Sequence, residues 1–204
     1  MHKLTVPISD EDIRALHVGD TVYLNGVIVT GRDAAHKYMI EHFIRHEPTD
    51  PEDIALHDKL KALLDGGVIY HCGPVVKKRE DGSWTFVAAG PTTSIREEVY
   101  EADVIRHFNL KGVIGKGGMG KNTLKACMDQ PAVYFHAIGG AATLIAQSVK
   151  EVLDVYKLDF GVPEAMWVIR VEDFPVVVTM DSHGNSIHEK VQAESEARLR
   201  ALLG

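Results

Sequence analysis

The segment VIGKGGMGK, Val113 to Lys121, places a glycine-rich loop directly after a short apolar run. Val113-Ile114 predicts a buried strand, and Asn122–Met128 predicts a helix after the loop. Four glycines within six residues allow the backbone to approach a small ligand closely. The flanking lysines, Lys116 and Lys121, indicate that this ligand is an anion. The segment therefore predicts a strand–loop–helix unit of an α/β fold with an anion-binding loop.

The rest of the chain alternates between strand and helix patterns, without an internal repeat or a low-complexity linker. Asp50-Pro51 marks the start of a helix that ends at Gly66-Gly67. Asn25-Gly26, between two β-rich runs, predicts a hairpin. This mixture predicts a single α/β domain with a mixed sheet. The other expected elements are strands at Leu4–Val6, Thr21–Leu24, Val27–Thr30, Val68–Cys72, Val75-Val76, Trp84–Val87, Ala132–Ala137, Met166–Val171 and Val176–Met180, and helices at Ala34–Arg45, Ile95–Phe108, Ala141–Val152 and Gln192–Leu203.

Composition restricts the class of protein. The 204 residues carry a formal net charge of −7, whereas a protein that neutralises nucleic-acid phosphates is normally basic. The N-terminal residues show no signal peptide and no apolar run is long enough to span a membrane, so a cytoplasmic protein is expected. The two cysteines, Cys72 and Cys127, form no CxxC pair and are too few to hold an iron–sulfur cluster. We expect no nucleic acid, membrane or metal bound by this chain.

The glycine loop also resembles a phosphate-binding P-loop. Gly115, Gly120 and Lys121 match the pattern G-x-x-x-x-G-K, and Asp181, after an apolar run, could be the acidic partner. The next position should carry a Ser or Thr hydroxyl for magnesium, but it carries Asn122. A nucleotide-binding protein is therefore one alternative, and a glycine turn that binds no ligand is another.

A second polar loop, Gly90–Arg96, precedes a predicted helix. Thr93 and Ser94 are candidates for its N-cap. Thr92 and Arg96 are four residues apart, so both can face one side. Thr92 can therefore face a ligand while a neighbour caps the helix.

The third polar loop places Arg32 at a strand-to-helix junction, where a guanidinium can bind a carboxylate through two hydrogen bonds. Asp33 is the predicted N-cap, and His36 either orients another group or is an ordinary histidine. Arg32, Arg96 and Lys116 thus lie on loops of the kind where α/β proteins bind ligands. If these loops converge, three cations beside a hydroxyl would suit a small dicarboxylate.

Five motifs together resemble the β subunit of the two-subunit class I hydro-lyases, the iron–sulfur fumarate hydratases and L(+)-tartrate dehydratases. The resemblance extends in order from about Thr5 to Ile187, nearly the whole chain. The motifs are GRDAAH at Gly31–His36, GPTTSIR at Gly90–Arg96, IGKGGM at Ile114–Met119, HAIGGAA at His136–Ala142 and DSHG at Asp181–Gly184.

The resemblance implies the swivelling β/β/α fold of the aconitase and fumarase group, over a hydro-lyase domain at residues 1–190 with a helical tail at residues 191–204. It also implies an α subunit that carries a 4Fe–4S cluster. The expected assembly is a heterotetramer with that subunit, or a homodimer of this chain alone, which would be inactive.

The implied reaction is the reversible hydration of fumarate to L-malate, or else the dehydration of tartrate to oxaloacetate. Thr92 would transfer the proton, and an unassisted threonine is too weak a base, so a carboxylate of the partner would have to activate it. At position 97 this chain has Glu97, where relatives often have methionine.

A binding module without activity is a third possibility. The resemblance assigns substrate carboxylates to Arg32, Arg96 and Lys116, close backbone approach to Gly117 and Gly118, catalysis to Thr92 and Lys116, and supporting roles to Asp33, His36 and Thr93.

Overall fold

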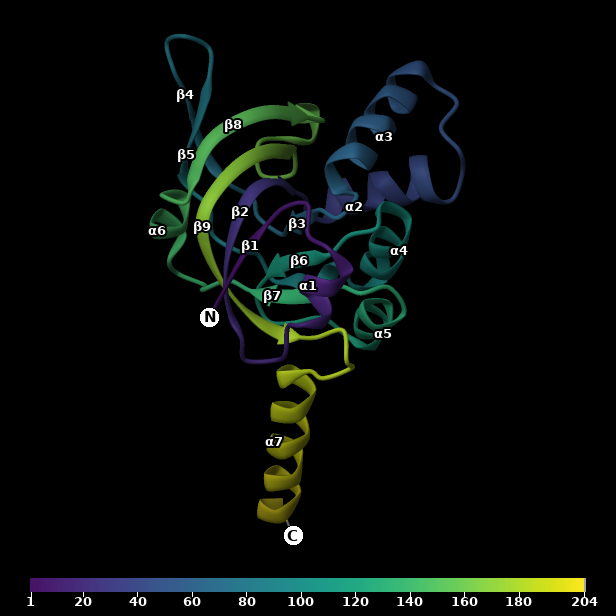
Figure 1. Ribbon diagram of the computed structural model, residues 1–204, viewed down its shortest axis with the longest axis vertical. Helices are drawn as coiled ribbons and strands as arrows, with labels where there is room; N and C mark the ends of the chain where they lie inside the picture. The colour runs from purple at the N-terminus through teal and green to yellow at the C-terminus, as the bar shows by residue number, and fades with distance from the viewer. Residues whose placement is uncertain (204) are drawn as a thin grey trace.

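Apolar strands buried on both faces build the centre of the protein (Figure 1). The computed structural model describes residues 1–203. Within them, β9 is antiparallel to β7, β8 and β2, whereas the neighbours from β1 to β7 are parallel. Because β9 pairs with both β7 and β2, the sheet closes on itself. The spatial order is β1 (His2–Thr5), β2 (Thr21–Thr30), β3 (Val68–Tyr70), β6 (Gly112–Gly115), β7 (Val133–His136), β9 (Met166–Met180) and β8 (Val149–Tyr156).

Successive residues of the central strands β3, β6 and β7 enter two different cores. Ile69 and Val113 pack on the side of the helices, whereas Val68 and Ile114 face the core that also contains Ile13. Such strands read as continuous apolar runs because both faces are buried. The prediction of one α/β domain with a mixed sheet is confirmed. The helices are α1 (Asp10–Arg14), α2 (Asp33–Met39), α3 (Pro51–Leu64), α4 (Glu98–Phe108), α5 (Lys121–Asp129), α6 (Ala142–Ala146) and α7 (Ile187–Leu203).

The hairpin predicted at Asn25-Gly26 is wrong. β2 continues through both residues, and β9 runs antiparallel along both halves of it, with a register shift between Leu24 and Gly26. Gly26 has φ +106°, and a Cβ there would lie 2.8 Å from the carbonyl oxygen of Val6. The Asn-Gly pair therefore forms a bulge within a long curved strand, because tertiary pairing with β9 extends past the local turn signal.

Two further predictions change for similar reasons. The predicted strands at Met166–Val171 and Val176–Met180 are one strand, β9. The helix predicted over Ala141–Val152 stops at Ala146, and the residues after it form β8, which pairs with β9. Predicted and observed elements agree at the hairpin of β4 (Val75–Lys78) and β5 (Trp84–Ala88). A π turn, η1 (Ile40–Ile44), follows α2, and two 3₁₀ turns are η2 (Ser94–Glu97) and η3 (Leu158–Phe160).

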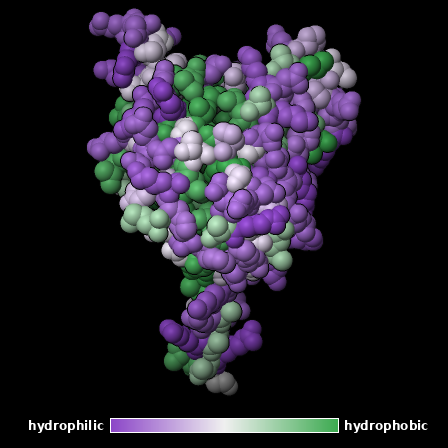
Figure 2. Space-filling view, viewed as in Figure 1, coloured by the Kyte–Doolittle hydropathy of each residue, from purple (hydrophilic) through white to green (hydrophobic). Residues whose placement is uncertain are grey.

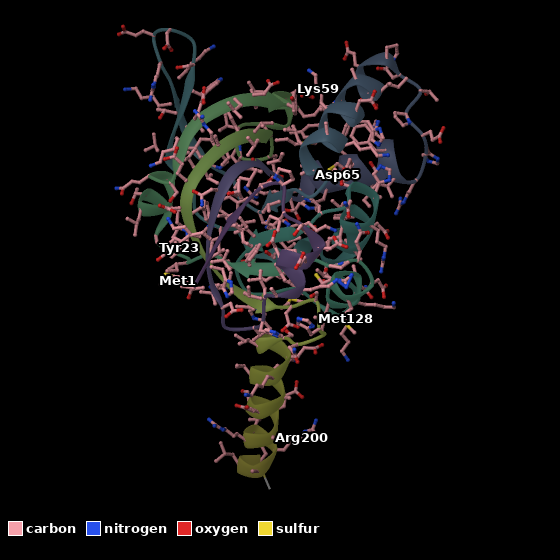
Figure 3. The ribbon with its side chains drawn as sticks, in the orientation of Figure 1. Met1, Tyr23, Lys59, Asp65, Met128 and Arg200 are labelled. Carbon is pink, nitrogen blue, oxygen red and sulfur yellow. The ribbon has the colours of Figure 1, made fainter. Side chains whose placement is uncertain are left out.

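The C-terminal helix projects away from the rest of the domain, where Figure 3 labels Arg200. α7 contains no buried residue and starts at Ile187, five residues before the predicted start at Gln192. Gly204 of the predicted tail lies outside the described residues, and the division at residue 190 stays a prediction. Figure 2 shows a mostly hydrophilic face with apolar patches between polar side chains. Within residues 1–203, none of the helices combines the length and the apolar character that crossing a membrane requires.

Candidate active site

The polar loops identified in the sequence meet at one edge of the sheet. β2, β3 and β6 are adjacent and parallel, so the loops after them leave the sheet at the same edge. The loop after β5 joins them through the backbone, because the N–H of Thr92 donates to His71 over 2.7 Å. In turn the N–H of Lys116 donates to Thr92 over 3.1 Å, and the N–H of Ser94 donates to Lys116 over 3.0 Å. The structure thus places the Thr92 and Lys116 loops side by side.

Arg96 connects Thr92 with the loop after β2. Its guanidinium donates to Thr92 Oγ1 over 3.3 Å and forms an ion pair with Asp33 at 3.0 Å. The prediction that Asp33 is the N-cap of α2 is wrong, because Asp33 is the first residue of the helix. Arg32 occupies the cap position, and its side chain forms no capping hydrogen bond. The side chain of Arg96 is 47% exposed, so it can also contact a ligand from solvent.

Arg32 is held by a residue that sequence reasoning missed. Its guanidinium lies 3.3 Å from a carboxylate oxygen of Glu164, which precedes β9. The other oxygen of Glu164 accepts a hydrogen bond from the N–H of Ala34 over 3.1 Å, at the start of α2. No local pattern marks Glu164, because only the pairing of β2 with β9 brings it to Arg32.

Lys116 has an available ammonium group. Within residues 1–203 it forms no ion pair and no side-chain hydrogen bond, whereas Arg32 and Arg96 each face a carboxylate. Its aliphatic chain passes the loop after β7, where a Cβ built on Gly139 would lie 3.5 Å from Lys116 Cδ. Among the three predicted cations, Lys116 is therefore the one without a carboxylate of this chain.

The two central glycines of the loop differ in their surroundings. Gly117 and Gly118 have φ values of +83° and +80°, which glycine adopts without strain. Gly117 is exposed, whereas a Cβ on Gly118 would lie 2.3 Å from the ring of His188 in α7. Gly117 thus leaves its backbone exposed, and Gly118 allows close packing against α7. Thr93 is exposed and bridges to Lys116 through its backbone only, as far as the described residues show.

The start of α5 already binds an anion, the side chain of Glu98. Its carboxylate accepts hydrogen bonds from the N–H groups of Gly120 (2.7 Å), Asn122 (2.9 Å) and Thr123 (3.3 Å), and from the Thr123 hydroxyl (2.7 Å). In a P-loop such N–H groups bind phosphate. Asp181 is equally engaged, because it accepts from the N–H groups of its own turn. The P-loop alternative therefore has no support in the structure.

Glu98→Ala is expected to destabilise the folded chain. The substitution leaves the N–H groups at the start of α5 without their charged acceptor, which costs about 2–3 kcal/mol of the free energy of unfolding. Chemical denaturation of the purified chain measures it. The adjacent Val99 is 72% exposed, so Val99→Ala is a matched control expected to change the free energy by less than about 0.5 kcal/mol. Equal stability of the two variants would contradict this role of Glu98.

Behind the loops lies a buried polar network. The predicted caps Thr93 and Ser94 form no cap bond. Instead Ser94 Oγ lies 2.8 Å from His71 Nδ1 and accepts a hydrogen bond from the Tyr134 hydroxyl over 2.8 Å. His71 Nε2 lies 2.9 Å from Glu101 Oε2. Gly115 leaves the room this network needs, since a Cβ there would lie 1.8 Å from Ser94 Oγ.

His36 belongs to the same network. Its Nδ1 lies 2.9 Å from the carbonyl oxygen of Arg32, and its Nε2 lies 3.0 Å from Glu101 Oε2, although not in line for a straight hydrogen bond. The atoms of His36, His71 and Glu101 lie within 4.8 Å of one another, a spacing that a metal ion could also use. Three of the four imidazole nitrogens have hydrogen-bond partners in Arg32, Ser94 and Glu101, whereas His36 Nε2 and Glu101 Oε1 have none within residues 1–203.

The cysteines do not fit an iron–sulfur cluster. Cys72 and Cys127 are both fully buried. Burial raises the pKa of the Cys72 thiol to about 12 and raises that of Cys127 as well, and two cysteines are fewer than the three or four that such a cluster uses.

Comparison with known proteins agrees with the five sequence motifs. A protein of Geobacillus stearothermophilus named as a class I fumarate hydratase is 50% identical over 196 residues, which are 96% of this chain but only 35% of that protein. A protein of Methanocaldococcus jannaschii named as an L(+)-tartrate dehydratase subunit beta is 45% identical over 97% of this chain and 96% of its own length. The L(+)-tartrate dehydratase subunit beta of Escherichia coli K12 is 40% identical over 90% of this chain and 85% of its own length.

The model of the family described as Fumarase C-terminus matches residues 2–191. This range includes every loop of the site described above. The chain therefore belongs to the fumarase C-terminus family.

Proposed function

We propose that this chain is the β subunit of an iron–sulfur hydro-lyase that interconverts fumarate and L-malate. The observation that carries the proposal is the convergence of Thr92, Arg96 and Lys116 in hydrogen-bonded loops at one edge of the sheet. The 50% identity to a protein named as a class I fumarate hydratase supports it. That protein is almost three times as long as the matched region, so this chain corresponds to about a third of it.

The cationic side chains would bind the two carboxylates of the substrate. Lys116 has no anionic partner within the described residues, so its ammonium gains most from a substrate carboxylate. Arg96 is half exposed and can share its guanidinium between Asp33 and substrate. Arg32 would contribute positive charge from beside Glu164.

Thr92 would transfer the proton at the substrate carbon. During dehydration Thr92 Oγ1 takes the proton from the carbon next to a carboxylate, and during hydration it returns that proton. The Arg96 guanidinium, which donates to Thr92 Oγ1, favours the deprotonated hydroxyl. A threonine also needs a base to take up its proton, and a carboxylate of the partner subunit would serve.

A partner subunit would hold the cluster. The two buried cysteines of this chain are too few to hold it, and two relatives carry names that designate a subunit beta. We therefore propose a cytoplasmic complex with an α subunit, in which this chain supplies the substrate-binding loops.

Co-expression with a cluster-bearing α subunit, followed by a fumarate hydration assay, tests the proposal. We expect activity from the complex and none from either chain alone. Full activity of the isolated chain would overturn the two-subunit assignment, and an inactive complex that still binds fumarate would identify a binding module.

L(+)-tartrate is the second candidate substrate. Two relatives at 45% and 40% identity are named as tartrate dehydratase subunits, and both match this chain over most of their own length. The same complex should therefore be assayed for the conversion of tartrate to oxaloacetate. The larger kcat/KM identifies the substrate.

A further inference from the structure

The buried network connects two loops that the proposed function uses. His36 belongs to α2 and contacts the backbone of Arg32, whereas His71 follows β3 and contacts Ser94 in the Thr92 loop. Glu101, on α4, is the residue that both histidines share. The side chains of all three are 0% exposed, so solvent cannot replace any of these contacts.

The contacts of His36 determine where its protons lie. The carbonyl oxygen of Arg32 can only accept a hydrogen bond, so Nδ1 must carry a proton. If Nε2 were unprotonated, its partial negative charge would lie 3.0 Å from the carboxylate oxygen of Glu101, which is repulsive even though the two atoms are not aligned for a straight hydrogen bond. A proton on Nε2 turns this contact into attraction between an imidazolium and a carboxylate.

The contacts of His71 are satisfied by a neutral ring. Nε2 donates to Glu101, and Nδ1 accepts from the Ser94 hydroxyl, which itself accepts from Tyr134. One carboxylate thus compensates one positive charge, that of His36, and a buried pair of this kind avoids an unpaired charge.

We propose that Glu101 is a positioning residue for the carboxylate-binding loops, and that its buried pair with the His36 imidazolium holds the Arg32 and Thr92 loops together. The expected effect of Glu101 on kcat/KM rests on the proposed function, whereas the contacts that hold the two loops together do not depend on it. Glu101 holds Arg32 through the His36 ring and Ser94 through the His71 ring, so it acts on both loops without touching substrate.

The charges around the pair agree with this assignment. Burial alone would lower the pKa of His36, but the carboxylate of Glu101, with Glu97 from η2 and the Arg32 carbonyl, raises it above 6.5. Burial opposes ionisation of Glu101 too, yet His36 and His71 lower its pKa from 4.5 to about 2. The pair therefore contributes its full stabilisation between about pH 4.5 and pH 6.5, the ordinary pKa values of glutamate and histidine. It is lost as pH rises through the raised pKa of His36, and as pH falls toward about 2.

Nitrogen NMR of the histidine-labelled chain tests the charge state of His36. The measurement is made at the ordinary histidine pKa of about 6.5, where an unpaired imidazole would be half neutral, and His36→Asn identifies the signals. We expect protons on both Nδ1 and Nε2 of His36 at that pH. A neutral His36 ring would overturn the proposal, and so would a stoichiometric divalent metal in the purified chain, measured by elemental analysis.

Kinetics of Glu101→Gln in the assembled enzyme test the positioning role. The glutamine amide keeps the shape of the Glu101 side chain, but it has no negative charge to compensate the His36 imidazolium. We therefore expect kcat/KM to fall by about tenfold to 100-fold, mainly through KM. The matched control is Asp103→Asn, because Asp103 is a carboxylate of the same helix that is 60% exposed and pairs with Arg106, away from both histidines. We expect it to stay within about threefold of wild type.

The outcomes separate this inference from the proposed function. Wild-type kinetics of Glu101→Gln, in an enzyme that Lys116→Ala inactivates, would overturn the positioning role and leave the proposed function standing. Wild-type kinetics of Lys116→Ala would overturn the proposed function, while the NMR result would still decide the charge state of His36. If Glu101→Gln does not fold, the NMR measurement on the unmodified chain still decides between a charged and a neutral pair.

Discussion

Lys116→Ala is expected to lower kcat/KM of the assembled enzyme by roughly 100-fold, because it removes a charged donor to a substrate carboxylate. Among the three predicted cations, Lys116 alone has no carboxylate partner within residues 1–203. Its replacement therefore breaks no ion pair of the folded chain. The measurement is steady-state kinetics with fumarate and with tartrate, together with thermal denaturation to show that the variant is folded.

The matched control is Lys121→Ala. Lys121 is the exposed first residue of α5, and the P-loop pattern would make it the important lysine. Under the proposed function, Lys121→Ala retains wild-type kinetics. If the loop bound phosphate instead, Lys121→Ala would lose activity and Lys116→Ala would keep it. Activity lost with Lys121→Ala and retained with Lys116→Ala would remove the carboxylate assignment.

Thr92→Val is expected to lower kcat by a factor of roughly 100 to 10,000, the usual size of a general acid–base contribution. Valine has nearly the same shape, but it lacks the hydroxyl that accepts a hydrogen bond from Arg96 at 3.3 Å. Because Arg96 and Lys116 remain, KM should change much less than kcat. A primary isotope effect with deuterated substrate would show whether proton transfer limits the rate.

Thr92→Ser serves as the conservative variant. It keeps a hydroxyl at the same backbone position, which is fixed by hydrogen bonds to His71 and Lys116. We expect it to recover most of the activity that Thr92→Val loses. If both variants lose activity equally, the hydroxyl is not the group that acts, and the role of Thr92 is one of packing.

Local sequence signals predicted the structure correctly where backbone N–H groups find their hydrogen-bond partner within a few residues. Asp50 caps α3 through the N–H groups of Glu52 and Asp53, as the Asp-Pro pair predicts. They failed where a distant strand supplied the partner, since the Asn25-Gly26 pair became a bulge when β9 paired along all of β2. Propensity is a weak prior that tertiary pairing overrides.

The candidate site divides in the same way. The residue types and spacing of Thr92, Arg96 and Lys116 could be read from their motifs, because glycines and hydroxyls at strand ends are local features. Glu164 beside Arg32, and Glu98 at the start of α5, could not be read, because each acts on a loop far away in the chain.

The glycine loop shows most directly what each level determined. By itself, the sequence determined a strand, a glycine-rich loop and a helix around Val113–Lys121, because hydrophobic period and glycine content act locally. Only the tertiary structure decided which part of that loop is available to a ligand. Glu98 comes from α4 and occupies the N–H groups of Gly120 and Asn122, which leaves Lys116, whose backbone pairs with the Thr92 loop, as the cation beside the other polar loops. Such a contact depends on how two helices pack, and no pattern within either helix encodes that packing.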